Sequence, residues 1–457
     1  MSSSGAFHLL GTRRFLPLFG TQMLGAFNDN LFKHSMVLFV VYEHYRNEFT
    51  ETWFSALTTG IFILPFFFLS ALSGQLADAT DKARIIRIVK ICEIGIMIVG
   101  AGGLVMALNG IMVDTVAIPI LLVALLAMGV HSTFFGPIKY AILPQHLHKE
   151  EVLGGTGLVE AGTYIAILGG TLLAGIIPVG VAAVTVFTVA LIGYMFGRQV
   201  PPAPPLEPGH SIDFNVFSSS IRLIRATLKI RRLFLAIVAI SFFWTIGAVL
   251  FIQFPPLVKN VLTADKAVAS VFLAIFSIGV AIGSLAVNRL LKGEVSARYS
   301  MPAVLAMGLF VFFFHWVAAS WDRAPEVMVN GATVQTLYNV GDFVAHPGAP
   351  WLTLSLLGIA MFGGIFVVPL YAFLTTTVKK SEAARTVAAN NIINSGAMVI
   401  GSLIAMSLTL LEVGTADQLL LAAAMCSVSA YLAWRLHRAV EDHNDGVLQA
   451  EGLPPTV

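Results

Sequence analysis

The chain has 457 residues, of which 57% are hydrophobic and only 11% are charged. A soluble protein of this length carries a far more charged surface, so the composition indicates an integral membrane protein. The formal net charge of +2 leaves no large basic patch, and no nucleic-acid partner is therefore expected.

Twelve apolar runs approach the length of about 20 residues that a helix needs to cross a bilayer. Arg13 and Arg14 precede the first run, which continues to about Tyr42 without a small-residue cleavage site. It is therefore predicted to be a retained helix rather than a signal peptide. The predicted spans are 15–42, 53–76, 85–108, 116–140, 152–176 and 179–198 in the first half, and 233–258, 266–292, 301–320, 350–377, 384–411 and 416–436 in the second.

A proline-rich segment separates the two sets of spans and breaks any helix there. Its helix-breaking residues are Pro201, Pro202, Pro204, Pro205, Pro208 and Gly209. The amphipathic segment that follows, 212–232, predicts an interfacial helix on the cytoplasmic surface, with an ordinary connection as the alternative. Its basic residues are Arg222, Arg225, Lys229, Arg231 and Arg232. The predicted domains are an N-terminal six-helix bundle at 1–198, a linker at 199–232, a C-terminal six-helix bundle at 233–438 and a tail at 439–457.

The distribution of basic residues predicts the side of the membrane on which each loop lies. If the N-terminus is cytoplasmic, 21 of the 27 Lys and Arg residues fall on the inside, and Lys90 is counted among them. The outside loops then hold only Arg46, Lys259, Lys266 and Arg323. Both termini are therefore expected to be cytoplasmic. The longest outside segment, 321–350, contains Asn330 and Gly331 between apolar residues, a pattern that fits a small hairpin.

The two halves carry similar sequences at corresponding spans. GQLAD at 74–78 ends the second span, and GSLAV at 283–287 ends the eighth. Likewise, GGTGLVEAG at 154–162 in the fifth span corresponds to AANNIINSG at 388–396 in the eleventh. Two parallel six-helix repeats are the pattern of the major facilitator fold. We therefore predict an all-α membrane protein with twelve transmembrane helices in two pseudo-symmetric six-helix bundles.

The loop after the second span, GQLADATDKAR at 74–84, resembles the signature between spans two and three of major facilitator proteins. Gly74 permits close approach of helices, and Asp78 can pair with a basic group or with the positive end of a helix in the other half. Lys82 and Arg84 belong to the basic cluster of the signature. A gating role is predicted for these four residues, with a hydrated, positively charged turn as the alternative.

Ionisable and amide side chains at membrane depth are costly, which makes them candidates for function. Asp29 and Lys33 are four residues apart and share a helical face, so they either line a cavity or form a structural bridge. The predicted substrate-binding residues are Asn28, Asp29, Asn30 and Lys33 in the first span, Glu160 in the fifth, and Asn390, Asn391 and Asn394 in the eleventh.

Other polar residues are expected to have structural roles. Glu93 and Lys139 lie near the predicted cytoplasmic face, where long side chains can extend to the surface, so structural or gating roles are expected. His34 and His131 fit interior histidines with satisfied hydrogen bonds better than proton carriers. The chain has only two cysteines, both in apolar runs, and no disulfide, metal site or cofactor is expected.

Four stretches resemble one family. They are FLPLF at 15–19, GAFNDNLFK at 25–33, FFGPIKYAILP at 134–144 and VEAGT at 159–163. On these residues, the chain resembles the bacterial lysophospholipid transporter family of the major facilitator superfamily. The resemblance is specific in the first 170 residues and only architectural in the second half.

The resemblance implies movement of lysophospholipids, chiefly lysophosphatidylethanolamine, from the outer to the inner leaflet of the bacterial cytoplasmic membrane, where they are reacylated. It implies no enzymatic activity and no strict coupling to an ion gradient. We expect a monomer, with a separate acyltransferase and acyl carrier protein ligase as candidate partner. Two alternatives stay open. One is a proton-coupled exporter of drugs or other amphiphiles, with Asp29 or Glu160 as proton carrier; the other is a non-transporting module that anchors enzymes of lipid remodelling.

Overall fold

The computed structural model describes residues 6–44, 48–205, 212–329, 332–411 and 413–450. The chain divides into two compact units by its internal contacts. The first unit comprises Met1–Thr227 with two short additions, Lys292–Glu294 and Leu374–Ser395. The second unit comprises Leu228–Leu291, Val295–Phe373 and Gly396–Val457.

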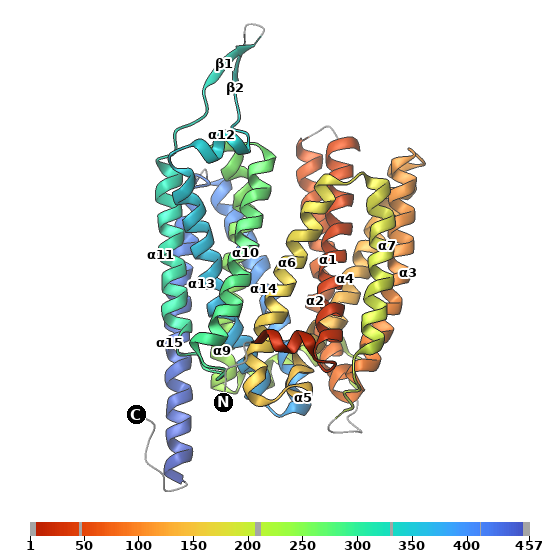
Figure 1. The fold of residues 1–457 in the computed structure, drawn as a ribbon, viewed down its shortest axis with the longest axis vertical. Helices are drawn as coiled ribbons and strands as arrows, with labels where there is room; N and C mark the ends of the chain where they lie inside the picture. The colour runs from red at the N-terminus through yellow and green to blue at the C-terminus, as the bar shows by residue number, and fades with distance from the viewer. Residues whose placement is uncertain (1–5, 45–47, 206–211, 330–331, 412, 451–457) are drawn as a thin grey trace. The chain divides into compact units, whose positions relative to one another are not determined.

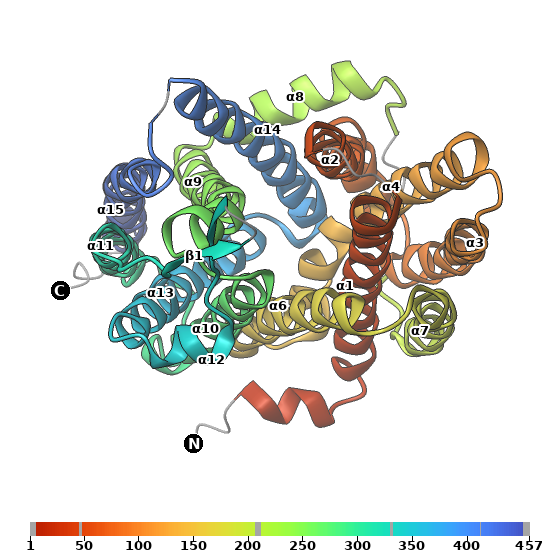
Figure 2. The ribbon, with the colours of Figure 1, turned by 90° about the horizontal axis from the view of Figure 1, so that it is seen from above.

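The first unit is a bundle of long helices (Figure 1). Its long helices are α1 (Leu16–Leu38), α2 (Glu48–Ala79), α3 (Lys82–Leu108), α4 (Ile118–Ala141), α6 (Val152–Ile176) and α7 (Val179–Gln199). The short helices α5 (Leu143–His146) and α8 (Val216–Leu228) complete it. In this bundle α1 packs on α6 and α7, α2 packs on α4, and α3 packs on α4 and α7, an arrangement visible from above in Figure 2.

The second unit is also helical. Its helices are α9 (Arg231–Pro256), α10 (Lys266–Leu290), α11 (Ser300–Ala319), α12 (Val340–Ala345), α13 (Ala349–Thr376), α14 (Ala383–Leu410) and α15 (Gln418–Ala450). The first part of α14 is counted with the first unit. The antiparallel strands β1 (Glu326–Val329) and β2 (Ala332–Gln335) form a hairpin that projects beyond α12 (Figure 1). The predicted hairpin is therefore confirmed, although its turn at Asn330 and Gly331 lies outside the described residues.

The twelve predicted spans coincide with long helices, which confirms the all-α membrane fold. Eleven described helices are long and apolar enough to cross a membrane. The twelfth predicted span is α1, whose polar residues at 28–34 lower its mean hydropathy. The helix of the last predicted span, α15, continues beyond residue 436 to Ala450.

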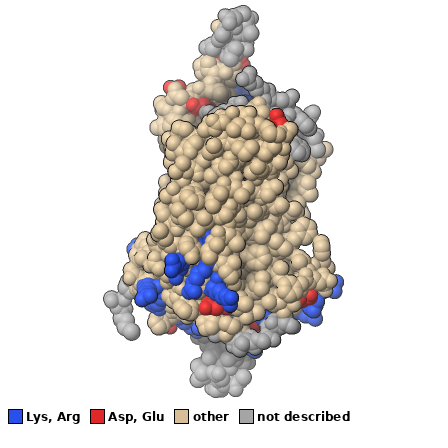
Figure 3. All heavy atoms as spheres, turned by 90° about the vertical axis from the view of Figure 1, so that its right-hand side faces the viewer, with Lys and Arg blue, Asp and Glu red and all other residues tan. Residues whose placement is uncertain are grey.

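A cluster of buried apolar side chains joins helices of the first unit. Its fully buried members include Leu31 and Phe32 of α1, Met97 and Leu104 of α3, Leu121, Leu125 and Met128 of α4, and Val186 of α7. On the face drawn in Figure 3, the middle of the molecule shows neither blue nor red among the described residues, and Lys and Arg gather toward one end. This is the pattern expected of a protein whose middle lies in hydrocarbon and whose basic residues lie at one membrane surface.

Candidate functional site

The polar face of α1 places two opposite charges close together without pairing them. Asp29 and Lys33 are both partly buried. The Ser132 hydroxyl of α4 donates a 2.7 Å hydrogen bond to Asp29 Oδ2, whereas Lys33 Nζ lies 5.9 Å from the centre of the Phe62 ring. Among the described residues, Asp29 and Lys33 form no ion pair with each other. One carboxylate and one ammonium therefore lie on the same face of α1, and neither has a direct counterion among the residues that the structure describes.

Glu93 of α3 is the centre of a buried network that joins three helices. Lys90 Nζ lies 2.5 Å from Glu93 Oε2, and His131 Nε2 of α4 lies 3.2 Å from the same oxygen. Asn28 Nδ2 of α1 donates a 3.0 Å hydrogen bond to Glu93 Oε1. The side chains of Lys90 and Glu93 are each only 1% exposed. Such a network stabilises a fold only while its charges remain paired.

The network corrects two expectations from the sequence. Glu93 does not extend to a membrane surface, because its carboxylate is held in the interior by Lys90 and His131. The count of basic residues placed Lys90 at the cytoplasmic surface, but its side chain lies in the interior of the bundle. It lies three residues, or almost one helical turn, before Glu93 and points to the same side of α3. His131 is an interior histidine, as expected, but its partner is a carboxylate.

A second buried carboxylate, that of Glu160, lies on α6. Glu160 of α6 is 2% exposed and accepts a hydrogen bond from the Tyr140 hydroxyl. Lys139 Nζ lies 4.8 Å from the centre of the Tyr140 ring and interacts electrostatically with both Glu160 and Asp29. The ammonium group of Lys139 is therefore attracted by the Asp29 carboxylate of α1 and by the Glu160 carboxylate of α6.

The His131 side chain links the Glu93 network to Asp29. Its Nδ1 lies 3.4 Å from the Ser132 hydroxyl, and that hydroxyl donates to Asp29. A continuous line of polar contacts therefore runs from the fully buried Lys90 to the partly buried Asp29. The carboxylates of Asp29 and Glu93 were candidates from the sequence, whereas Lys90, Ser132 and Tyr140 were not predicted to belong to the site. The close spacing of Lys90 and Glu93 in an apolar span was the available signal.

Asp78, at the end of α2, binds the start of α14. Its Oδ2 accepts a 2.9 Å hydrogen bond from Arg385 Nε. The backbone N–H groups of Ala384 and Arg385 donate to its two oxygens at 3.3 and 3.2 Å. A carboxylate at a helix N-terminus is favoured by both the unpaired N–H groups and the helix dipole. The loop signature predicted a basic group or a positive helix end as partner, and Asp78 contacts both.

The other residues with a predicted gating role lie in different surroundings. A Cβ atom at Gly74 would lie 2.7 Å from Ala388 Cβ and 3.0 Å from Arg385 Cα, so glycine is required for α14 to approach α2. Lys82 is fully buried, and its backbone N–H donates to the carbonyl of Ala203. Arg84 is exposed on the first turn of α3.

The three asparagines of α14 belong to the first unit. Asn390 is fully buried, and neither its amide nitrogen nor its amide oxygen has a hydrogen-bond partner among the described residues. Asn391 approaches α4, because a Cβ atom at Gly136 would lie 3.3 Å from its Nδ2. Asn394 is also buried. The remaining predicted residue, Asn30, donates to the Ala26 carbonyl of its own helix.

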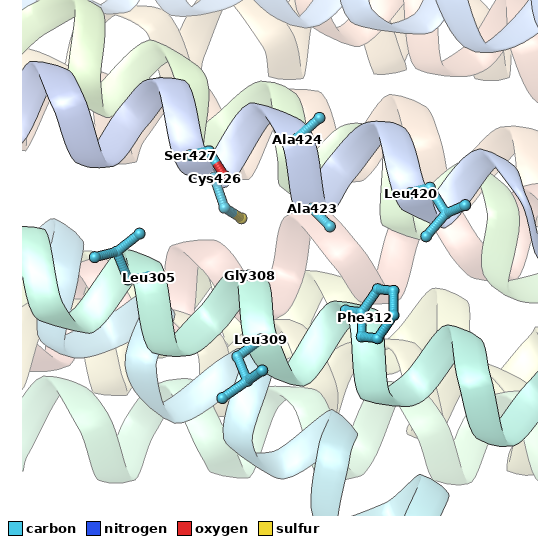
Figure 4. Close-up of a pocket in the computed structure, with 9 residues that line it drawn as sticks. All are labelled: Leu305, Gly308, Leu309, Phe312, Leu420, Ala423, Ala424, Cys426 and Ser427. Atoms are coloured by element: carbon cyan, nitrogen blue, oxygen red, sulfur yellow. The ribbon is translucent and has the colours of Figure 1, made fainter.

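Two surface pockets lie away from these polar residues. One, of about 400 Å³, lies between α11 and α15 and is lined mainly by apolar side chains (Figure 4). The other, of about 480 Å³, is lined largely by aromatic residues near the end of α11. Neither contains a residue predicted to bind substrate. Because recognition of a charged ligand needs buried polar groups as well as apolar walls, we assign the candidate site to the polar region of α1, α3, α4 and α6.

Long apolar helices around buried charges are the features of a multi-span membrane protein. A family model described as the Major Facilitator Superfamily matches residues 18–402. The chain therefore belongs to the Major Facilitator Superfamily, whose members are transporters, and the predicted fold class is confirmed.

The chain is similar to proteins named lysophospholipid transporter LplT. The protein from Salmonella heidelberg (strain SL476) is 24% identical over 397 residues, which cover 85% of this chain and 86% of that protein. The protein from Enterobacter sp. (strain 638) is 24% identical over 401 residues, which cover 86% and 87%. The resemblance found in the sequence is thus confirmed, and it extends over most of the chain.

Solved structures share the fold at low sequence identity. The human organic anion transporter MFSD10 (TETRAN) superposes with a TM-score of 0.72 and 12% identity, covering 92% of this chain and 99% of that chain. A bacterial homologue of the iron transporter ferroportin, in an outward-facing state, has a TM-score of 0.66 and 12% identity, with coverages of 93% and 100%. These similarities concern the fold alone.

Proposed function

We propose that this transporter moves lysophospholipids of the lysophosphatidylethanolamine type from the outer to the inner leaflet of a bacterial cytoplasmic membrane. In this proposal, both termini are cytoplasmic, the protein is a monomer, and a separate acyltransferase and acyl carrier protein ligase reacylates the product. The similarity to proteins named lysophospholipid transporter supports the substrate class. The assignment of the site rests on Asp29 and Lys33, which form no ion pair with each other among the described residues.

The lipid headgroup has one cation and one anion, which match the two charges on α1. Asp29 accepts hydrogen bonds from the ammonium group of the substrate, and Lys33 binds its phosphate as a point charge. Because no ion pair between the two side chains must first be broken, binding costs less than it would at a closed salt bridge. Lys139 and Glu160 contribute a further charge of each sign in the same region.

The buried network around Glu93 has a supporting role in this proposal. Asn28 precedes Asp29 in the chain, and its hydrogen bond to Glu93 fixes the rotation of α1. Ser132 fixes one oxygen of Asp29. A site whose side chains are already held in position pays a smaller entropic cost when the ligand binds.

The decisive experiment measures transfer of a fluorescent lysophosphatidylethanolamine across the bilayer of proteoliposomes. Lipid that has left the outer leaflet is no longer extracted by albumin. We expect transfer by the wild-type protein with or without a proton gradient. Asp29→Asn and Lys33→Gln should each lower the rate about tenfold or more, because each removes a charge and leaves a weaker hydrogen bond to the headgroup.

Glu150→Gln is the matched control, because Glu150 is an exposed carboxylate of the same unit. All variants are first compared by size-exclusion chromatography, so that loss of fold is distinguished from loss of binding. Wild-type proteoliposomes that transfer no lysolipid would overturn the substrate assignment. Gradient-driven export of an amphiphilic drug by the same vesicles would support the exporter alternative. Full transfer by Asp29→Asn would overturn the assignment of the site.

A further inference from the structure

The amphipathic helix α8 exposes an apolar stripe to its surroundings. Phe214, just before the helix, is 73% exposed, and Phe217 and Ile221 are 66% and 51% exposed. Phe217 and Ile221 are four residues apart and therefore share one helical face. Ser219 and Thr227 are buried and mark the face that packs on the protein. The apolar stripe thus lies on the side of α8 away from Ser219 and Thr227 and remains largely exposed.

A basic stripe borders the apolar one. Arg222 and Arg225 are three residues apart and both are exposed. At 100° per residue they lie on the flank of the helix next to Ile221. Lys229 and Arg231 continue the basic sequence. The exposed side of α8 thus combines large apolar side chains with an adjoining row of cations.

Two contacts attach the start of α8 to α2. The Phe217 ring meets the Phe68 ring edge to face at 5.5 Å. The backbone N–H of Asp213 donates a 2.9 Å hydrogen bond to Gln75 Oε1. Phe68 and Gln75 are two helical turns apart, so α8 begins alongside the last part of α2 (Figure 2). Arg222 is fixed in turn by a 2.6 Å ion pair with Asp213.

An exposed apolar stripe bordered by arginines matches the boundary between lipid chains and headgroups. The apolar side chains favour the region of the acyl chains, and the guanidinium groups bind phosphate oxygens. A membrane without net charge would offer a favourable environment only to the apolar side chains of this surface. The row of cations adds attraction to lipids with net negative charge. We propose that α8 binds the phosphate headgroups of anionic phospholipids in the leaflet on which it lies.

The attachment to α2 connects this surface to the Asp78 contact. Gln75, which holds Asp213, follows Gly74 directly and lies three residues before Asp78. A lipid that holds Arg222 and Arg225 therefore also restrains the end of α2.

The test is a quenching experiment in nanodiscs with the full-length protein. Cys92 and Cys426 are replaced by serine, and Ala226→Cys carries a bimane fluorophore. Ala226 is exposed next to Arg222 and Arg225. Phosphatidylglycerol and phosphatidylcholine, each with a spin label near the headgroup, are compared as quenchers at equal fractions. We expect stronger quenching by phosphatidylglycerol, and a preference that disappears at high salt.

The variants Arg222→Gln and Arg225→Gln should each reduce this preference about fivefold. Lys149→Gln, which removes an exposed lysine elsewhere in the first unit, should leave it unchanged. Equal quenching by the two lipids, or a preference that survives removal of both arginines, would overturn the proposal. So would the absence of quenching, which would place α8 in water or against a protein. No outcome depends on transport of lysophospholipid.

Discussion

At the scale of single residues, the buried charges of the first unit differ in how completely they are paired. Glu93 is enclosed by Lys90, His131 and Asn28. Asp29 has a hydroxyl partner and Lys33 an aromatic one. A charge enclosed by fixed partners serves the structure, whereas a charge without a counterion remains available to a ligand. This difference separates the supporting residues from the proposed binding residues.

The enclosed network makes a prediction about stability. Glu93→Gln leaves the Lys90 ammonium buried without its counterion, which typically costs about 3–5 kcal/mol. The double variant Lys90→Met with Glu93→Leu removes both charges and should recover much of this loss. The measurement is the thermal unfolding midpoint of the protein in detergent. A wild-type midpoint for Glu93→Gln would show that the pair does not stabilise the fold.

Residue positions were partly predictable from the sequence. The period of the helix correctly placed Asp29 and Lys33 on one face of α1. It did not reveal whether they bind each other, because that depends on Ser132 and Phe62, which are far away in the chain. The positive-inside count treated Lys90 as a surface charge, since it considers the distance to the end of a span and ignores the neighbouring helices.

At the scale of elements, the contact between α2 and α14 depends on one glycine and one carboxylate. Gly74 lets the helices approach, and Asp78 binds the N-terminus of α14 together with Arg385. We propose that this contact gates transport, in agreement with the loop signature. The sequence indicated Gly74, Asp78, Lys82 and Arg84 as gating residues but not Arg385, because the partner of Asp78 is about 300 residues later in the chain.

A substitution at Gly74 tests the close approach. In Gly74→Ala, the new methyl group meets Ala388 Cβ and the backbone of Arg385, and such overpacking costs about 1–3 kcal/mol. The start of α14 should then separate from α2 more often. Ser381 is buried just before α14 begins. In the variant Ser381→Cys, the rate of labelling by maleimide should therefore increase about fivefold or more when Gly74→Ala is added.

The matched control lies on the same helix. At Gly60 an added Cβ atom meets nothing within 4 Å, so Gly60→Ala should label at the wild-type rate. Equal labelling of the Gly74 and Gly60 variants would show that the glycine is not needed for the contact. Faster labelling of both would indicate a general loss of stability.

At the scale of the whole molecule, the chain has the fold of its superfamily, and the orientation in the membrane is a prediction from charge. Arg298 precedes α11, and Glu326 lies in the hairpin strand that follows it. The two residues flank one helix of 20 residues, which is about 30 Å long and sufficient to cross the hydrocarbon. They are therefore expected on opposite sides of the membrane.

Cysteine labelling in intact cells tests this orientation. In a background with Cys92→Ser and Cys426→Ser, Glu326→Cys should react with an impermeant maleimide, and Arg298→Cys should react only after permeabilisation. The physical reason is that basic loops are retained in the cytoplasm. The reverse pattern would place both termini outside and would reverse the proposed direction of lysophospholipid movement.

The sequence by itself determined the twelve apolar helices, the hairpin and the superfamily. Each depends on hydropathy, charge or a short motif within one stretch of chain. These local properties are the same however the helices pack against one another. Only the tertiary structure decided that Lys90, Glu93, His131 and Asn28 meet, that Asp29 and Lys33 do not, and that Arg385 binds Asp78. The packing of helices distant in sequence brings those side chains within reach, because a helix fixes only the face on which each residue lies.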